Sequence, residues 1–156
     1  MKRIFGFVSV GLAAVLLAFP LKVSAQQRPD YSYVGIGGGD DGFVINGKIT
    51  VYDNLSLRPS VATDFDFDDS EDVSYLLPVT YDFNAVDPDG NLYPFVGTGI
   101  GGDLGSDSTI EFALTAGLDY RIGNDWVANG SVNYLPFADD DEIDFTLGIG
   151  YVFKGI

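Results

Sequence analysis

The residues best suited to chemistry are closely spaced aspartates. Asp64, Asp66 and Asp68 stand at alternate positions, as in the first half of a calcium-binding loop. An EF-hand loop would continue with Gly at its sixth position and Glu at its twelfth, where this chain has Asp69 and Tyr75. The sequence therefore excludes an EF-hand, and a looser site for a divalent cation stays open.

Acidic residues gather in four connections, written GGGDDG, DFDDSED, GDLGSDS and FADDDE, which alternate along the chain with three other connections. In an up-and-down barrel, alternate connections lie at the same end. The sequence thus predicts one acidic rim whose carboxylates suit Ca²⁺ or Mg²⁺. The candidate ligands on it are Asp66, Asp68, Asp69, Asp139, Asp140 and Asp141. The alternative is a solvated, repulsive surface that binds no ion.

Other catalytic and binding chemistries find little support. The chain has no His and no Cys, which excludes a Ser-His-Asp triad, disulfides and thiolate metal sites. The stretch GTGIGG matches a dinucleotide-binding motif, but an acidic turn and a strand follow it where that motif needs a helix. With 23 acidic and 8 basic residues, the chain should be repelled by nucleic acid. We expect no enzyme and no cofactor other than the rim cation.

The elements that must position these residues are predicted to be β-strands, because turn signals recur at short, even spacing. No segment after residue 25 has a convincing helical period. Eight strands are expected, at approximately 31–39, 42–52, 55–66, 72–84, 92–102, 109–122, 126–137 and 142–154.

The strands alternate between large apolar residues and small or polar ones. In STIEFALTAGLDYRIG, from Ser108 to Gly123, every second residue from Ile110 to Ile122 is apolar. The other face is rich in Gly and polar residues and poor in Lys, unlike the outside of a soluble barrel. A narrow eight-stranded lumen needs small residues, whereas a charge that faces lipid costs roughly 2–4 kcal/mol. We therefore predict an all-β, eight-stranded, antiparallel up-and-down transmembrane barrel with its apolar face outward.

Charged residues on the small-residue face should then lie in the lumen. Because periplasmic turns of such barrels are short, the acidic rim is expected outside the cell and most of these charges near the periplasmic end. The predicted lumen ion network comprises Lys48, Arg58, Asp82, Asp119, Arg121 and Lys154. The alternative is a set of independent, water-solvated charges.

The first residues have the pattern of a secretory signal. Lys2 and Arg3 precede an apolar run, and Val23-Ser24-Ala25 matches a small-x-small cleavage site. We expect a signal peptide at 1–25, cleaved after Ala25, and one barrel domain at 26–156. The alternative is an uncleaved membrane anchor.

Short motifs in order along the chain, YDF, YPFVGTGIGG, AGLDYRIGNDW and LGIGYVF, resemble the small outer-membrane β-barrel proteins of the OmpA/OmpX and opacity-protein type. The resemblance implies a closed barrel in the bacterial outer membrane. It also implies insertion by the barrel-assembly machinery, guided by a terminal strand that ends in an aromatic residue, here Phe153. We expect a monomer.

The function expected from these observations is that of a non-enzymatic bacterial outer-membrane barrel with a structural or surface-interaction role in the cell envelope. Its expected contacts are outer-membrane lipid and lipopolysaccharide, whose phosphates a rim cation could bridge. Two alternatives stay open, a narrow porin-like channel and a soluble lipocalin-like ligand-binding barrel.

Overall fold

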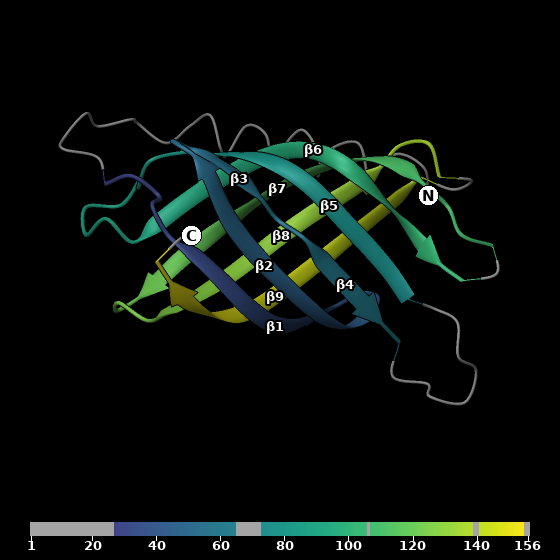
Figure 1. The fold of residues 1–156 in the computed structure, drawn as a ribbon, viewed down its shortest axis with the longest axis horizontal. Coiled ribbons are helices and arrows are strands. Elements are labelled where there is room, and N and C mark those ends of the chain that lie inside the picture. The colour runs from purple at the N-terminus through teal and green to yellow at the C-terminus, as the bar shows by residue number, and fades with distance from the viewer. Residues whose placement is uncertain (1–26, 65–72, 106, 139–140, 155–156) are drawn as a thin grey trace, which may run out of the picture.

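Nine β-strands form one closed sheet in the computed structural model, which describes residues 27–64, 73–105, 107–138 and 141–154 (Figure 1). The strands are β1 (Ser32–Gly39), β2 (Gly42–Tyr52), β3 (Leu55–Leu57), β4 (Ser60–Thr63), β5 (Val73–Asp82), β6 (Leu92–Leu104), β7 (Glu111–Ile122), β8 (Trp126–Leu135) and β9 (Glu142–Phe153). All neighbouring strands pair antiparallel, and β1 pairs with both β2 and β9, which closes the barrel.

The barrel has eight strand positions, because β3 and β4 share one of them. Both pair with β2 on one side and with β5 on the other. The interruption falls at Arg58 and Pro59, where the prediction had one continuous strand. Proline has no N–H to donate to a ladder, but the Arg58 N–H still bonds the Pro78 carbonyl at 3.0 Å. The predicted fold is therefore confirmed, with its third strand in two pieces.

Large apolar side chains cover the outside of the barrel. Leu147 is 72% exposed, and Phe112, Leu114 and Ile149 each lie more than two-fifths exposed. Fully buried polar side chains such as Thr80 lie on the other face of the strands. The prediction of an apolar face turned outward is confirmed, and this arrangement suits hydrocarbon as the surrounding solvent.

Glycines on the inner face allow neighbouring strands to approach closely. A Cβ placed on Gly37 would lie 2.1 Å from the carbonyl oxygen of Leu147 on β9, and one on Gly97 would lie 2.3 Å from that of Val79 on β5. Backbone oxygens cannot yield as a flexible side chain could. The small residues of this face therefore permit the tight curvature of the barrel.

The two ends of the barrel differ in their connections. The end that we call the acidic rim carries the β1–β2, β4–β5, β6–β7 and β8–β9 connections. The opposite end carries the other turns, the start of β1 and the end of β9, which pair through Ser32 and Phe153. Within the described residues, no helix is long and apolar enough to cross a membrane. The predicted signal peptide at 1–25 lies outside the described residues.

Candidate functional site in the barrel lumen

Four charged side chains meet across the lumen near the end opposite the acidic rim, and we call them the lumen network: Lys48, Arg58, Asp82 and Asp119. Arg58 Nη2 lies 3.0 Å from Asp82 Oδ1 and 2.9 Å from Asp119 Oδ2. Its Nη1 also donates to Asp119 Oδ1 at 3.2 Å, so this contact is bidentate. Lys48 Nζ lies 3.1 Å from Asp82 Oδ2. Two positive and two negative charges therefore balance one another.

The lumen network is sealed from solvent. Lys48, Asp82 and Asp119 are 0% exposed and Arg58 is 7% exposed. Charges taken out of water need both an opposite charge and hydrogen bonds. Arg58 Nε donates to the Thr80 hydroxyl at 3.0 Å, and the guanidinium carbon lies 3.5 Å from the ring centroid of Phe95. The Ser56 hydroxyl donates to Asp82 Oδ2.

Two tyrosines complete the network, Tyr31 immediately before β1 and Tyr33 within it. The Tyr31 hydroxyl donates to Asp119 Oδ2 at 2.9 Å, and the Tyr33 hydroxyl accepts a hydrogen bond from Arg58 Nη1 at 3.2 Å. Lys48 Nζ lies 3.6 Å from the centroid of the Tyr31 ring. Tyr31 also packs in a small apolar cluster with Tyr33, Ala85, Tyr93 and Val127. Aromatic packing and ion pairing thus occupy the same end of the lumen.

The structure brings together four of the six residues expected in this network. Arg121 lies beside it instead, with its guanidinium carbon 4.7 Å from the Tyr31 ring centroid and Nη2 donating to the Asn124 carbonyl at 2.7 Å. The prediction that Lys154 joins the network is wrong. Lys154 follows the last residue of β9 and is exposed, because the inward alternation continues only as far as the strand does.

Sequence reasoning missed the two tyrosines, although a signal for them was present. Tyr31 and Tyr33 alternate with the outward Val34, in step with Gly35 and Gly37 on the small-residue face. That register places both rings in the lumen. Both side chains are buried, in contrast to Trp126, which is exposed on the outer surface.

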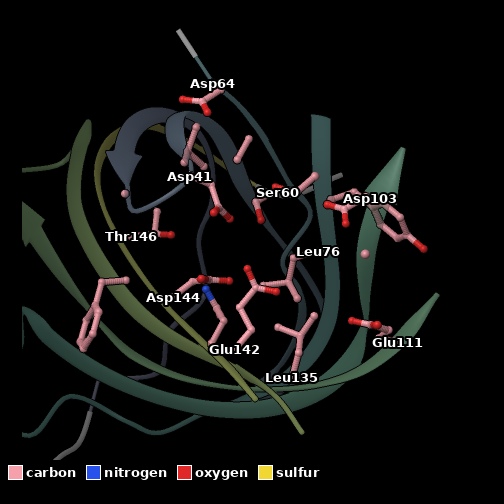
Figure 2. A pocket seen from close by; sticks show the side chains of 18 residues that line it. Asp41, Ser60, Asp64, Leu76, Asp103, Glu111, Leu135, Glu142, Asp144 and Thr146 are labelled. Carbon is pink, nitrogen blue, oxygen red and sulfur yellow. The ribbon is translucent and has the colours of Figure 1, made fainter. Parts of the chain in front are cut away.

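The other end of the lumen opens into a cavity of about 340 Å³, which we call the vestibule (Figure 2). Leu76 and Leu135 contribute apolar side chains to its lining. Its lining contains six carboxylates, from Asp41, Asp64, Asp103, Glu111, Glu142 and Asp144. Glu111 on β7 and Asp144 on β9 both contribute to this lining.

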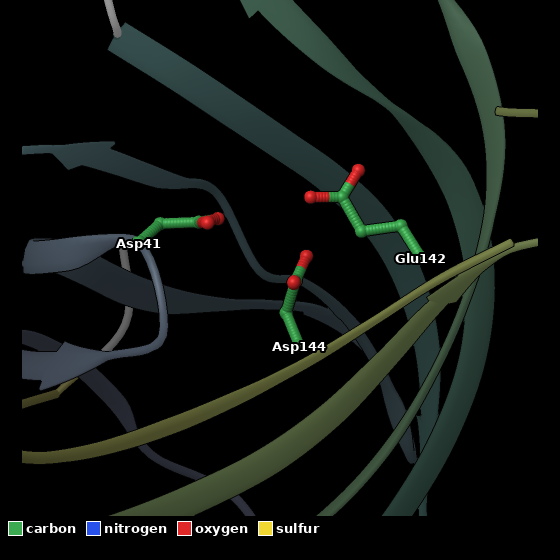
Figure 3. Close-up of side chains that lie close together, drawn as sticks. All are labelled: Asp41, Glu142 and Asp144. Carbon is green, nitrogen blue, oxygen red and sulfur yellow. The ribbon is translucent and has the colours of Figure 1, made fainter. Parts of the chain in front are cut away.

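Three of these carboxylates converge, from Asp41 in the β1–β2 turn and from Glu142 and Asp144 on β9 (Figure 3). One carboxylate oxygen from each lies within 4.8 Å of those of the other two. Burial, followed by repulsion from Asp103 and then Asp40, raises the pKa of Asp41 above its ordinary value. The folded barrel therefore concentrates negative charge that a proton or a cation would relieve.

This trio differs from the six rim ligands expected from the sequence. Asp66, Asp68, Asp69, Asp139 and Asp140 lie outside the described residues, and Asp141 is exposed. Asp41 belongs to a connection expected on the rim, but neither Asp41 nor Asp144 was among the expected ligands. Inward alternation along β9 and proximity to the β1–β2 turn are what bring them together.

Comparison with known proteins agrees with this geometry. The N-terminal β-barrel domain of Pseudomonas aeruginosa OprF superposes with a TM-score of 0.59 at 18% identity, over 81% of this chain and 100% of that one. A de novo designed transmembrane β-barrel superposes with a TM-score of 0.58 at 21% identity, over 82% of this chain and 99% of the design. This chain has the fold of the small outer-membrane β-barrels.

A sequence match indicates where in the cell the barrel is located. The chain is 30% identical over 107 residues to outer membrane protein AlkL of Ectopseudomonas oleovorans, a match that covers 50% of this chain and 45% of that protein. The chain thus matches less than half the length of that relative. No protein-family model matches. The exposed apolar surface and the sequence match to an outer membrane protein place the barrel in the outer membrane.

Proposed function

We propose that this outer-membrane barrel is non-enzymatic, that its lumen is closed to ion flow, and that its acidic rim faces the outside of the cell as a surface-interaction site. The observation that carries the proposal is the buried lumen network. Its four charged side chains reach across the barrel from β2, the β3–β4 junction, β5 and β7. A structural role in the envelope suits a barrel whose centre is filled with side chains.

The lumen is expected to be closed to ions because its charged side chains are already paired with one another. A permeating ion would have to displace Arg58 from two carboxylates and separate Lys48 from Asp82. The vestibule leads inward to a cavity of only about 40 Å³, which Arg58, Tyr33 and Phe95 help to line. The wide part of the lumen therefore narrows as it approaches the network.

The first prediction concerns conductance. The wild-type barrel, inserted into a planar lipid bilayer, is expected to produce no current steps above the leak of the bare bilayer. An open porin inserted into the same bilayer serves as the positive control. A steady conductance that recurs with each insertion would contradict the proposed closure and favour a narrow porin-like channel.

The acidic rim supports the second part of the proposal, a cation-dependent contact with lipopolysaccharide. Short turns at the opposite end are typical of the periplasmic side, which would set the rim against the outer leaflet. The oxygens of Asp41, Glu142 and Asp144 converge closely enough to share one ion. Hard carboxylate oxygens suit Ca²⁺ or Mg²⁺, and the same ion could contact lipid phosphates.

The second prediction is therefore a calcium-dependent gain in stability. At a calcium concentration roughly ten times the dissociation constant, one site on the folded state adds about 1.4 kcal/mol. We expect millimolar calcium to raise the melting temperature of the detergent-folded barrel. Asp144→Asn, which removes one charge from the trio, should abolish most of the rise. A matched change at the opposite end, Asp89→Asn, should leave it intact, because Asp89 is an exposed turn residue.

Two outcomes of this titration would contradict a rim cation site. One is a melting temperature that does not change in millimolar calcium. The other is an equal rise in wild type, Asp144→Asn and Asp89→Asn, which would indicate general screening of a chain of formal charge −15. Repeating the titration in vesicles with and without lipopolysaccharide separates ion binding from the lipid contact.

A further inference from the structure

A small cavity of about 40 Å³ lies in the lumen between the lumen network and the vestibule. It shares Ser60, Leu76, Asn133 and Thr146 with the lining of the vestibule, so the two spaces adjoin. Its lining is mainly polar, and two asparagines from different strands take part in it, Asn46 on β2 and Asn129 on β8.

The two asparagines bond each other but leave half of their hydrogen-bonding atoms unused. Asn46 Nδ2 donates to Asn129 Oδ1 at 2.8 Å. Among the residues that the structure describes, Asn46 Oδ1 and Asn129 Nδ2 are buried without a hydrogen-bond partner. Asn129 as a whole is only 8% exposed. Buried polar groups are almost always paired with protein or with ordered water, so this pair requires a third participant.

We propose that the cavity binds an ordered water molecule, which donates to Asn46 Oδ1 and accepts from Asn129 Nδ2. The unused atoms are one acceptor and one donor, and water supplies the complementary donor and acceptor from one molecule. Exchanging O and N in both amides would again leave one donor and one acceptor, so the requirement does not depend on their orientation. A volume of about 40 Å³ accommodates one water, whose share of liquid volume is about 30 Å³.

Ions fit this cavity less well than water does. A bare cation would meet the amide N–H of Asn129 and the guanidinium of Arg58, which also lines the cavity. An anion would meet Asn46 Oδ1, and the charge of Arg58 is already balanced by Asp82 and Asp119. A neutral molecule that both donates and accepts matches every one of these groups.

Magnetisation transfer from water to side-chain amides tests the proposal in the ¹⁵N- and ²H-labelled wild-type barrel in micelles. A bound water that stays for nanoseconds gives laboratory-frame and rotating-frame cross-peaks of opposite sign, and we expect this signature at the Asn129 amide. The Asn54 amide is an internal control, because its Nδ2 already donates to the Asp82 carbonyl at 2.7 Å and to Asn84 Oδ1 at 2.9 Å.

Variants distinguish a bound water from proton exchange through a nearby hydroxyl. Thr115→Val removes a cavity hydroxyl that donates to Asn133 Oδ1, and it should leave the Asn129 cross-peak in place. Asn129→Leu removes the donor, and loss of the cross-peak in this variant assigns the signal to the Asn129 amide. The absence of a cross-peak at Asn129 in wild type would overturn the proposal, as would its loss in Thr115→Val.

Discussion

Replacing Arg58 by Met is expected to lower the free energy of unfolding of the barrel by about 3–5 kcal/mol, the range for removing one member of a buried charge pair. The guanidinium contacts both Asp82 and Asp119, and neither carboxylate is exposed. After the substitution Asp82 keeps Lys48, whereas Asp119 keeps only hydroxyl donors. A buried carboxylate then remains without a neutralising charge.

Urea unfolding of the folded barrel in micelles measures this loss. Trp126 reports on it, since it is the only tryptophan of the chain and lies partly exposed at the outer surface. The same substitution at Arg28 is the matched control. Arg28 pairs with Asp53 at 3.3 Å, but both side chains are about two-thirds exposed, so a change of only about 0–1 kcal/mol is expected.

A double variant identifies the origin of the loss. Arg58→Met combined with Asp119→Leu removes both charges of the bidentate pair and should recover part of the stability, since apolar replacements of buried ion pairs are often neutral or stabilising. If Arg58→Met proves as stable as Arg28→Met, the lumen network does not contribute the expected stability to the barrel. If the double variant has a lower free energy of unfolding than Arg58→Met alone, the uncompensated charge of Asp119 is not the cause of the lost stability.

A charge placed on the outer surface should have the second largest effect. Five exposed side chains form an outward row on β9, and Ile149 is the middle one. The other four are Phe145, Leu147, Tyr151 and Phe153. The Ile149 side chain should therefore face the centre of the bilayer. Ile149→Arg is expected to lower the free energy of unfolding in lipid vesicles by about 2–4 kcal/mol, the range for Arg on the lipid face near the midplane.

The control for this variant is Ile110→Arg. Ile110 is also apolar and exposed, but it precedes β7 in a connection of the acidic rim, where the expected loss is about 0–1 kcal/mol. Equal losses at the two sites would contradict the assignment of Ile149 to the bilayer centre. A soluble lipocalin-like barrel would show little loss at either site, because an arginine facing water is not penalised.

The amino-acid sequence predicted the architecture because a barrel in lipid imposes a simple alternation. Residues such as Leu114 and Leu118 face hydrocarbon, and Thr115 and Asp119, each one position further along the strand, face the lumen. This rule is local, so it can be applied one strand at a time. It placed the charges of Lys48, Arg58, Asp82 and Asp119 on the inner face, whereas the acidic rim followed from the alternation of connections between the two ends of the barrel.

The partners of those charges depended on the register between strands, which alternation leaves undetermined. Pairing of Tyr33 with Lys48, and of Asp82 with Phe95, sets these side chains at one level of the barrel. Closure of β1 against β9 then brings Asp41 near Asp144. Lys154 fits the alternation in the sequence, but the prediction that it lies in the lumen is wrong, because it follows the last residue of β9.

The sequence by itself therefore determined the class of fold, the face turned to lipid and the side of the strands on which the four charges of the lumen network lie. Those properties follow from the period of two residues along each strand. Only the tertiary structure decided that Tyr31 joins the lumen network, that Arg121 stays beside it, and that Asn46 meets Asn129. These contacts join strands far apart in the chain, and they depend on the shear and curvature of the closed barrel.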